Sequence, residues 1–164
     1  MNNNLEKFLK ILTAIKERFN LPIIVSTHPR TMKKIQPVFL KNSGISFLKP
    51  FNFSDFIKLQ INAACVLSDS GTITEETSIL KFPALNIRES FERQEGMSIG
   101  NVFLTGFNEK LILDNILNIL EKKIDFSNLE TDPDYDTNNI SKKIYSIIVS
   151  YIDVIKREHY RIFD

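Results

Sequence analysis

The fold is indicated most directly by one run of residues, Leu67-Ser68-Asp69-Ser70-Gly71-Thr72-Ile73-Thr74-Glu75-Glu76, which is typical of a strand that turns sharply into a helix. The apolar residues 63–67 predict a buried strand. Gly71 permits a backbone conformation that other residues resist, which favours a tight turn. Thr72 and Glu75 have the S/T-x-x-E spacing of a capping box, so we expect a helix to start here.

A strand-to-helix turn of this kind is a candidate anion site. The first N–H groups of a helix have no partner within the helix, and the helix dipole adds partial positive charge. The hydroxyls of Ser70 and Thr72 stand where they can add donors to a phosphate. The alternative is a helix start without a ligand, because capping boxes occur at many helix starts.

A second segment, Pro83-Ala84-Leu85-Asn86-Ile87-Arg88-Glu89-Ser90-Phe91-Glu92-Arg93-Gln94-Glu95-Gly96, predicts a strand that runs into a charged loop. In an open parallel sheet, ligands bind beyond the carboxyl ends of the strands. We therefore expect this loop and the Ser70 turn to open on the same crevice, with local positive potential from Arg30, Arg88 and Arg93.

Strands and helices are expected to alternate along the chain. Apolar spacing predicts helices over 5–19, 31–41, 54–61, 109–120 and 141–160, and strands over 21–26, 45–48, 63–67, 83–87 and 102–104. Pro37 should bend or shorten the second of these helices, and Ser54 should cap the third. The polar stretch 125–139 predicts a surface loop. The alternation implies right-handed crossovers and a parallel sheet covered on both faces.

Composition narrows the class of protein. The chain has 164 residues, 43% of them hydrophobic, which is enough for a real core. A net charge of +1 argues against a nucleic-acid surface, and no run is apolar enough to cross a bilayer. The single cysteine, Cys65, fits a reducing cytoplasm and is expected to fill space in a strand rather than act as a nucleophile.

The pair of motifs D-S-G-x-I-x-E-E and x-R-x-x-x-E-R-x-E resembles the C-terminal half of the non-hydrolysing UDP-N-acetylglucosamine 2-epimerases. The resemblance runs from the His28-Pro29-Arg30 turn to the terminal helix. It implies a Rossmann-like, three-layer α/β domain, one half of a glycosyltransferase-B (GT-B) type architecture. It also implies a homodimeric full-length enzyme that needs no cofactor or metal.

The resemblance also implies a reaction. These enzymes invert C2 of a UDP-linked 2-acetamido sugar by eliminating UDP to a glycal and adding it back. The carboxylates that move protons belong to the family's N-terminal domain, so this chain should hold UDP and stabilise its growing charge. The form His28-Pro29-Arg30-Thr31 resembles the branch that acts on 6-deoxy sugars, the UDP-N-acetyl-L-fucosamine synthases of capsule and O-antigen pathways.

Residue roles follow from the resemblance. Ser70, Gly71 and Thr72 match the phosphate-binding turn, although many members have a second glycine in place of Thr72. Glu76 matches the acceptor of the ribose hydroxyls, whereas Glu75 is expected to serve the cap. The remaining matches are Arg93 on a phosphate, Phe56 against the uracil, His28 at the leaving group, and Arg30 as a further candidate. A solvated arginine is the alternative for Arg93, and a core position is the alternative for Phe56.

The domain organisation is also an expectation. Residues 1–134 should form the UDP-binding domain, and 135–164 should form a helix that packs back towards a missing N-terminal domain. Because Met1–Asn4 lead directly into a helix, the chain resembles one half of a longer enzyme and should be inactive alone. The alternatives are half of a UDP-sugar glycosyltransferase of the same architecture and a stand-alone UDP-binding module.

Overall fold

The computed structural model describes residues 2–90, 93, 96, 100, 102–124, 126–128 and 130–162. Contacts divide the chain into two units, Met1–Thr131 and Asp132–Asp164. Every strand among the described residues lies in the first unit, and the long helix α8 (Ile140–Glu158) lies in the second.

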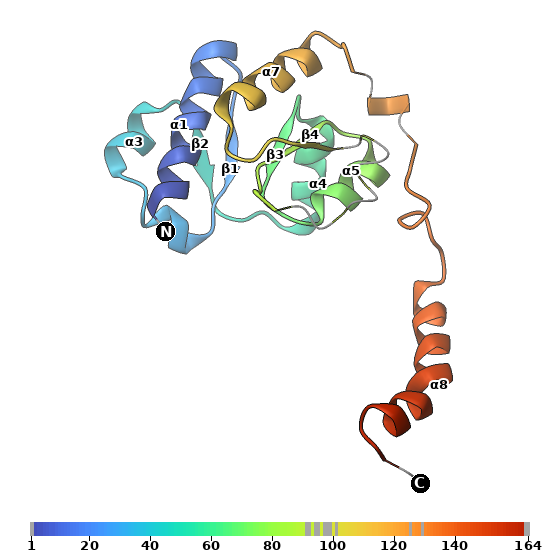
Figure 1. The fold of residues 1–164 in the computed structure, drawn as a ribbon. Helices are drawn as coiled ribbons and strands as arrows, with labels where there is room; N and C mark the ends of the chain where they lie inside the picture. Colours follow the sequence, from blue (N-terminus) through green and yellow to red (C-terminus); the bar gives the residue numbers. More distant parts are fainter. Residues whose placement is uncertain are drawn as a thin grey trace. The chain divides into compact units, whose positions relative to one another are not determined.

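The strands of the first unit are short and pair in parallel (Figure 1). Strand β1 (Ile24–Ser26) pairs with β2 (Ser46–Leu48). A second sheet has the order β3 (Val66–Ser68), β4 (Ala84–Asn86), β5 (Val102–Leu104), which is also their order in the sequence. The predicted α/β class with parallel strands is therefore confirmed. The central strand β4 is buried along its whole length, as expected for a strand covered on both faces.

Side chains alternate across the β3–β4–β5 sheet and form two cores. One row, Val66, Ala84 and Val102, packs with Ile73 and Leu80 of α5 (Ile73–Leu80) and with Phe82. The opposite row is Leu67, Leu85 and Phe103. It packs with Ile11 and Ile15 of α1 (Asn2–Phe19) and with Ile112, Ile116 and Ile119 of α7 (Glu109–Leu120). Helices on both faces of the sheet give the predicted three layers.

Two predicted helix starts are wrong. Residues 31–41 do not form one bent helix but contribute to two short ones, α2 (Pro29–Met32) and α3 (Pro37–Asn42). Each begins at a proline, whose fixed φ and missing N–H suit the first turn of a helix. Helix α4 (Phe53–Asn62) is capped by Asn52 rather than Ser54, because the Asn52 side-chain oxygen accepts the N–H of Asp55 at 2.9 Å.

The predicted loop 125–139 contains a short 3-10 helix, η1 (Phe126–Asn128). Phe126 is only 6% exposed and meets the ring of Phe103 edge-on, with 5.8 Å between ring centroids. The polar composition of this stretch therefore concealed one apolar anchor that belongs to the core.

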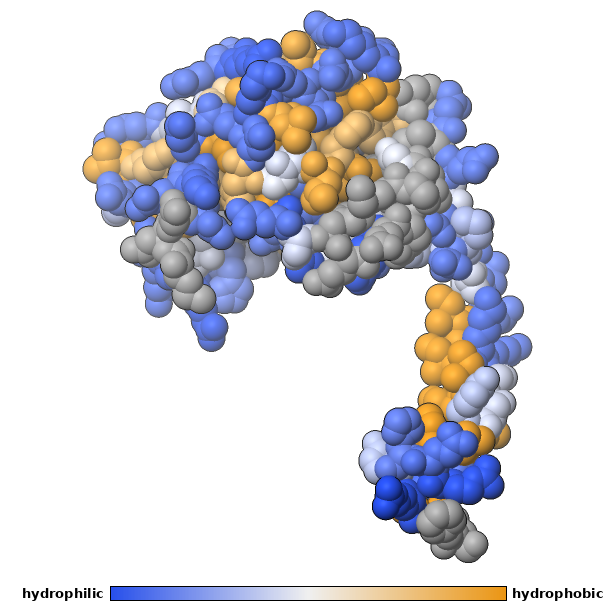
Figure 2. All heavy atoms as spheres, viewed as in Figure 1, coloured by the Kyte–Doolittle hydropathy of each residue, from blue (hydrophilic) through white to orange (hydrophobic). Residues whose placement is uncertain are grey.

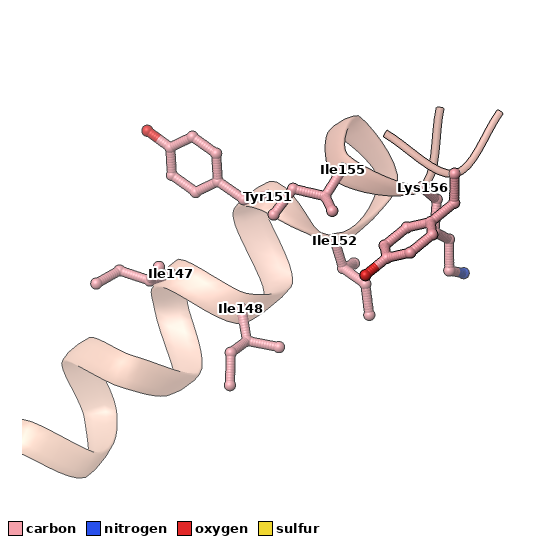
Figure 3. Close-up of a pocket in the computed structure, with 7 residues that line it drawn as sticks. Ile147, Ile148, Tyr151, Ile152, Ile155 and Lys156 are labelled. Atoms are coloured by element: carbon pink, nitrogen blue, oxygen red, sulfur yellow. The ribbon is translucent and has the colours of Figure 1, made fainter. Parts of the chain in front are cut away.

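The second unit is dominated by α8, whose amphipathic pattern was predicted. Its apolar side is not buried, and Figure 2 shows it as an orange strip along the helix. Ile147, Ile148, Tyr151, Ile152 and Ile155 line an open groove on this side, with Lys156 beside them (Figure 3). No described helix, α8 included, is long and apolar enough to cross a membrane.

Candidate functional site

The turn after β3 is held by its own hydroxyl groups. The N–H of Ser70 donates to Ser68 Oγ at 3.1 Å, and the N–H of Thr72 donates to Ser70 Oγ at 3.3 Å. The two hydroxyls of Ser70 and Thr72 also bond to each other at 2.9 Å. These hydrogen bonds hold the turn in one conformation at the start of α5, where the sequence predicted a tight turn from strand to helix.

Gly71 does not have the positive φ that favours glycine. The described glycines with positive φ are Gly44, Gly100 and Gly106, so the conformational reason given above for Gly71 is wrong. A Cβ built on Gly71 would lie 3.5 Å from Arg88 Nη1 and 3.8 Å from Arg93 Nη2. Two guanidinium groups therefore approach the turn at Gly71 to within ordinary contact distance of a side chain placed there.

The predicted capping box at the start of α5 is also wrong. Thr72 is the N-cap, but it has helical φ and ψ and its side chain makes no capping hydrogen bond. The Thr72 hydroxyl instead donates to Glu76 Oε1 at 2.7 Å. Glu75, assigned to the cap from the sequence, accepts from Arg93 Nε at 2.9 Å.

The Glu75–Arg93 ion pair aims the arginine at the turn. The two side chains are 27% and 34% exposed, so the pair is only partly screened by water. Arg93 Nε donates to Glu75 Oε1, and Nη2 of the same guanidinium group lies near Gly71. Of the E-R-x-E motif, Glu92 and Glu95 lie outside the described residues.

Arg88 is a member of the site that the sequence analysis mentioned only for its charge. It follows β4, and its N–H donates to the buried side chain of Asn86 at 2.9 Å, which fixes where the chain leaves the strand. Two residues after the last position of a central strand is where ligand-binding side chains gather in such sheets. That rule was a signal that could have found Arg88.

Glu76 connects the turn to helix α4. Besides Thr72 at Oε1, it accepts from Gln60 Nε2 at Oε2, at 2.6 Å. Gln60 lies on α4 and is 3% exposed. Gln60 is not among the residues expected from the sequence, although a glutamine on the apolar face of an amphipathic helix is an unusual residue that must find a polar partner.

The other predicted residues lie on other elements. His28 follows β1 and caps α2, where its Nδ1 accepts the N–H of Arg30 at 3.2 Å; both side chains are exposed. Phe56 lies one turn before Gln60 on α4 and is 37% exposed, so the alternative of a fully buried core position does not hold. The structure thus joins Ser70, Gly71, Thr72, Glu75, Glu76 and Arg93 in one cluster. No side-chain hydrogen bond or ion pair among the described residues joins His28, Arg30 or Phe56 to it.

Cys65 has no part in this cluster. Its side chain packs with the core that lies between the β3–β4–β5 sheet and helices α1 and α7, called the α1–α7 core below. Burial raises the pKa of the thiol from 9.0 to about 12. A thiol that stays protonated at neutral pH is a poor nucleophile and a poor metal ligand. Among the described residues, no group of three or more His, Cys, Asp or Glu side chains is placed to hold a metal ion.

Comparisons with known proteins identify a family. The family model described as UDP-N-acetylglucosamine 2-epimerase matches residues 1–149. A UDP-N-acetylglucosamine 2-epimerase of Methanocaldococcus jannaschii is 32% identical over 129 residues, which are 76% of this chain and 35% of the relative. One from Methanococcus maripaludis is 31% identical over 154 residues, 89% of this chain and 41% of the relative. The chain therefore spans well under half the length of these relatives.

Solved structures extend the comparison to the fold. The UDP-N-acetylglucosamine 2-epimerase of Rickettsia bellii is similar with a TM-score of 0.83 and 43% identity, over 98% of this chain and 44% of that one. The enzyme of M. jannaschii in complex with UDP-GlcNAc and UDP has a TM-score of 0.74 and 29% identity, over 92% and 41%. The Rossmann-like, GT-B type architecture expected from the sequence is confirmed, and this chain belongs to the UDP-N-acetylglucosamine 2-epimerase family.

Proposed function

We propose that the Ser70 turn and the two arginines bind the diphosphate of a UDP-linked 2-acetamido sugar. The observation that carries the proposal is the convergence of two guanidinium groups on the turn, with Arg88 Nη1 and Arg93 Nη2 within 4 Å of the position of a Cβ on Gly71. A helix N-terminus and two guanidinium groups around one space form a site for an anion with several oxygens. Support also comes from the M. jannaschii relative, whose structure holds UDP-GlcNAc and UDP.

The rest of the nucleotide then follows along α5 and α4. Glu76, one turn into α5, is proposed to accept hydrogen bonds from the ribose hydroxyls, because a carboxylate offers two acceptor oxygens. Phe56 is proposed to pack against the uracil. His28, with Arg30 beside it, is proposed to face the leaving group, where a histidine can donate a hydrogen bond to developing charge.

As part of a longer enzyme, the chain would stabilise UDP as it leaves during inversion at C2. Fixed donors aimed at developing charge are an effective means of lowering a barrier. The proton transfers at C2 need groups on both faces of the sugar, and we assign them to the rest of that enzyme. The proposal includes a cytoplasmic location, homodimerisation of the full enzyme, and a 6-deoxy-hexosamine substrate for capsule or O-antigen synthesis, the last resting on the His28-Pro29-Arg30 form.

Calorimetry with UDP and uridine tests the binding site. The chain should bind UDP weakly, in the millimolar range. Arg93→Ala should weaken UDP by about tenfold or more but uridine by less than twofold, because a charge-assisted bond to phosphate is lost. Glu76→Ala should weaken both ligands alike. Arg18→Ala is a matched control, since Arg18 pairs with Asp114 on α7 and should affect neither ligand. A folded chain that does not bind UDP at millimolar concentration would contradict the site.

Hydrogen exchange tests the division of labour. In D₂O the chain alone should not place deuterium at C2 of UDP-N-acetylglucosamine or of a UDP-N-acetyl-6-deoxyhexose, as followed by NMR. Exchange should appear when the chain is joined to the remainder of a full-length family member, and should fall again with Arg93→Ala. Exchange by the chain alone would show that it supplies the base itself.

A further inference from the structure

The carboxylate of Glu76 is held from two sides by neutral donors. Thr72 Oγ1 lies 2.7 Å from Oε1, and Gln60 Nε2 lies 2.6 Å from Oε2. Thr72 belongs to the turn that begins α5, whereas Gln60 comes from α4, sixteen residues earlier than Glu76. Each carboxylate oxygen therefore has one protein donor, and the four lone-pair sites of the group are half used.

Gln60 is buried and has little freedom to form a different contact. It is 3% exposed, and its Oε1 is buried without a hydrogen-bond partner among the described atoms. Rotating the amide by 180° would not give Oε1 a hydrogen-bond donor, because Oε1 would then face the Glu76 carboxylate and repel it. A buried amide that leaves one oxygen unpaired is costly in a protein interior. The bond to Glu76 is the contact in the structure that offsets this cost.

We propose that Gln60 is a positioning residue that sets the preference of this site for a ribonucleotide. By holding Oε2, it fixes the plane of the Glu76 carboxylate, so that the unused lone pairs meet the two vicinal hydroxyls of the ribose. A carboxylate on a flexible side chain would have to lose its freedom on binding, and Gln60 has already removed it. The inference rests on the proposed role of Glu76 as the ribose acceptor.

A purely structural role for Gln60 predicts something different. A bond that only joined α4 to α5 would, when lost, loosen the whole site and weaken every ligand equally. A positioning role predicts that the loss is confined to ligands that carry ribose hydroxyls. The ratio of affinities for UDP and for 2′,3′-dideoxy-UDP measures this directly, because both ligands have the same base and the same diphosphate.

The experiment is calorimetry on the full chain with UDP and 2′,3′-dideoxy-UDP. Gln60→Leu should weaken UDP about tenfold and dideoxy-UDP by less than twofold. Asn115→Leu is the matched control, an amide on α7 that bonds within its own helix, and it should leave both affinities unchanged. Equal weakening of both ligands by Gln60→Leu, or no weakening of either, overturns the inference.

A second variant keeps the test open if Gln60→Leu does not fold. Gln60→Glu has nearly the same size but places a second carboxylate against Glu76, and two such groups share a proton only at lower pH. The preference for UDP over dideoxy-UDP should be lost at pH 8 and should recover at pH 5, since a shared proton restores the bond. A preference that is unchanged at both pH values overturns the inference. Failure of the wild-type chain to bind either ligand would instead contradict the proposed function.

Discussion

Helices α7 and α8 have similar patterns of isoleucine but opposite environments. On α7, Ile112, Ile116 and Ile119 are at most 8% exposed, because β4 and α1 cover them. On α8, isoleucines at the same kind of spacing, 144, 148, 152 and 155, are 44–54% exposed. The pattern shows that a helix has an apolar side, but not what covers it. The cover of α7 comes from its own unit, and unit 2 has no other described helix or strand to cover α8.

The largest expected difference between the two regions is in thiol reactivity. Cys65 has a pKa of about 12 against an ordinary value of 9.0, which lowers its thiolate fraction near pH 8 about a thousandfold. A chain with Cys65→Ser and Ile148→Cys should carry an exposed thiol with ordinary reactivity. Because a thiolate of higher pKa is also the stronger nucleophile, part of this difference is offset, and reaction with a disulfide reagent at pH 8 should be about thirtyfold faster for the α8 cysteine. Similar rates would show that the α1–α7 core opens readily.

Because of the same thiol, the first unit should become less stable as the pH rises above about 9. The folded-state pKa lies above the unfolded value, so the contribution of the neutral thiol is complete below about pH 9. It is lost as pH rises towards 12, because the unfolded chain then releases the proton and the folded chain keeps it. Cys65→Ser should reduce this dependence in urea unfolding between pH 8 and pH 10.

A matched pair of truncations compares the two helices in energy. Ile112→Ala should lower the free energy of unfolding by about 3 kcal/mol, because Ile112 is fully buried and its loss leaves a cavity. Ile148→Ala should change it by less than about 0.5 kcal/mol, since Ile148 is 54% exposed. Urea unfolding followed by circular dichroism measures both. A loss for Ile148→Ala close to that of Ile112→Ala would mean that α8 is covered in solution.

The smallest expected effect is that of removing α8 altogether. A chain that ends at Asp136 keeps the whole α1–α7 core, the second core between α5 and the sheet, and the Ser70 turn. Its urea midpoint and its affinity for UDP should match those of the full chain. A midpoint that falls by more than about 1 M would show that the first unit depends on the second.

Sequence reasoning found the order of the elements because each buried strand is a short apolar run between helical patterns. The predicted ends of the strands were wrong because apolar residues continue beyond the residues that pair with the neighbouring strand. The predicted strand 21–26 begins only at Ile24, and partly buried Ile23 packs on the core from outside it. Phe126 was missed for the opposite reason, since one aromatic residue in a polar stretch carries no periodic signal.

In the candidate site, the sequence predicted the position of the turn but not its contacts. Ser70 and Thr72 lie in the turn as expected, but their hydroxyls bond to each other, a contact that was not predicted. The capping role of Glu75 was wrong because Arg93, eighteen residues later, binds the same carboxylate. Gln60 was missed because its contact with Glu76 depends on how α4 and α5 are rotated against each other, which the pattern of either helix alone does not contain.

The second sheet has a consequence for how the chain is made. Val66 pairs with Ala84 and Ala84 pairs with Val102, so both crossovers advance the chain by the same number of residues. The entropy of closing a loop depends on its length, which makes the two closures about equally difficult. Each strand also joins the sheet beside the one that left the ribosome just before it. The sheet can therefore grow in the direction of synthesis, with no early strand waiting unpaired for a late one.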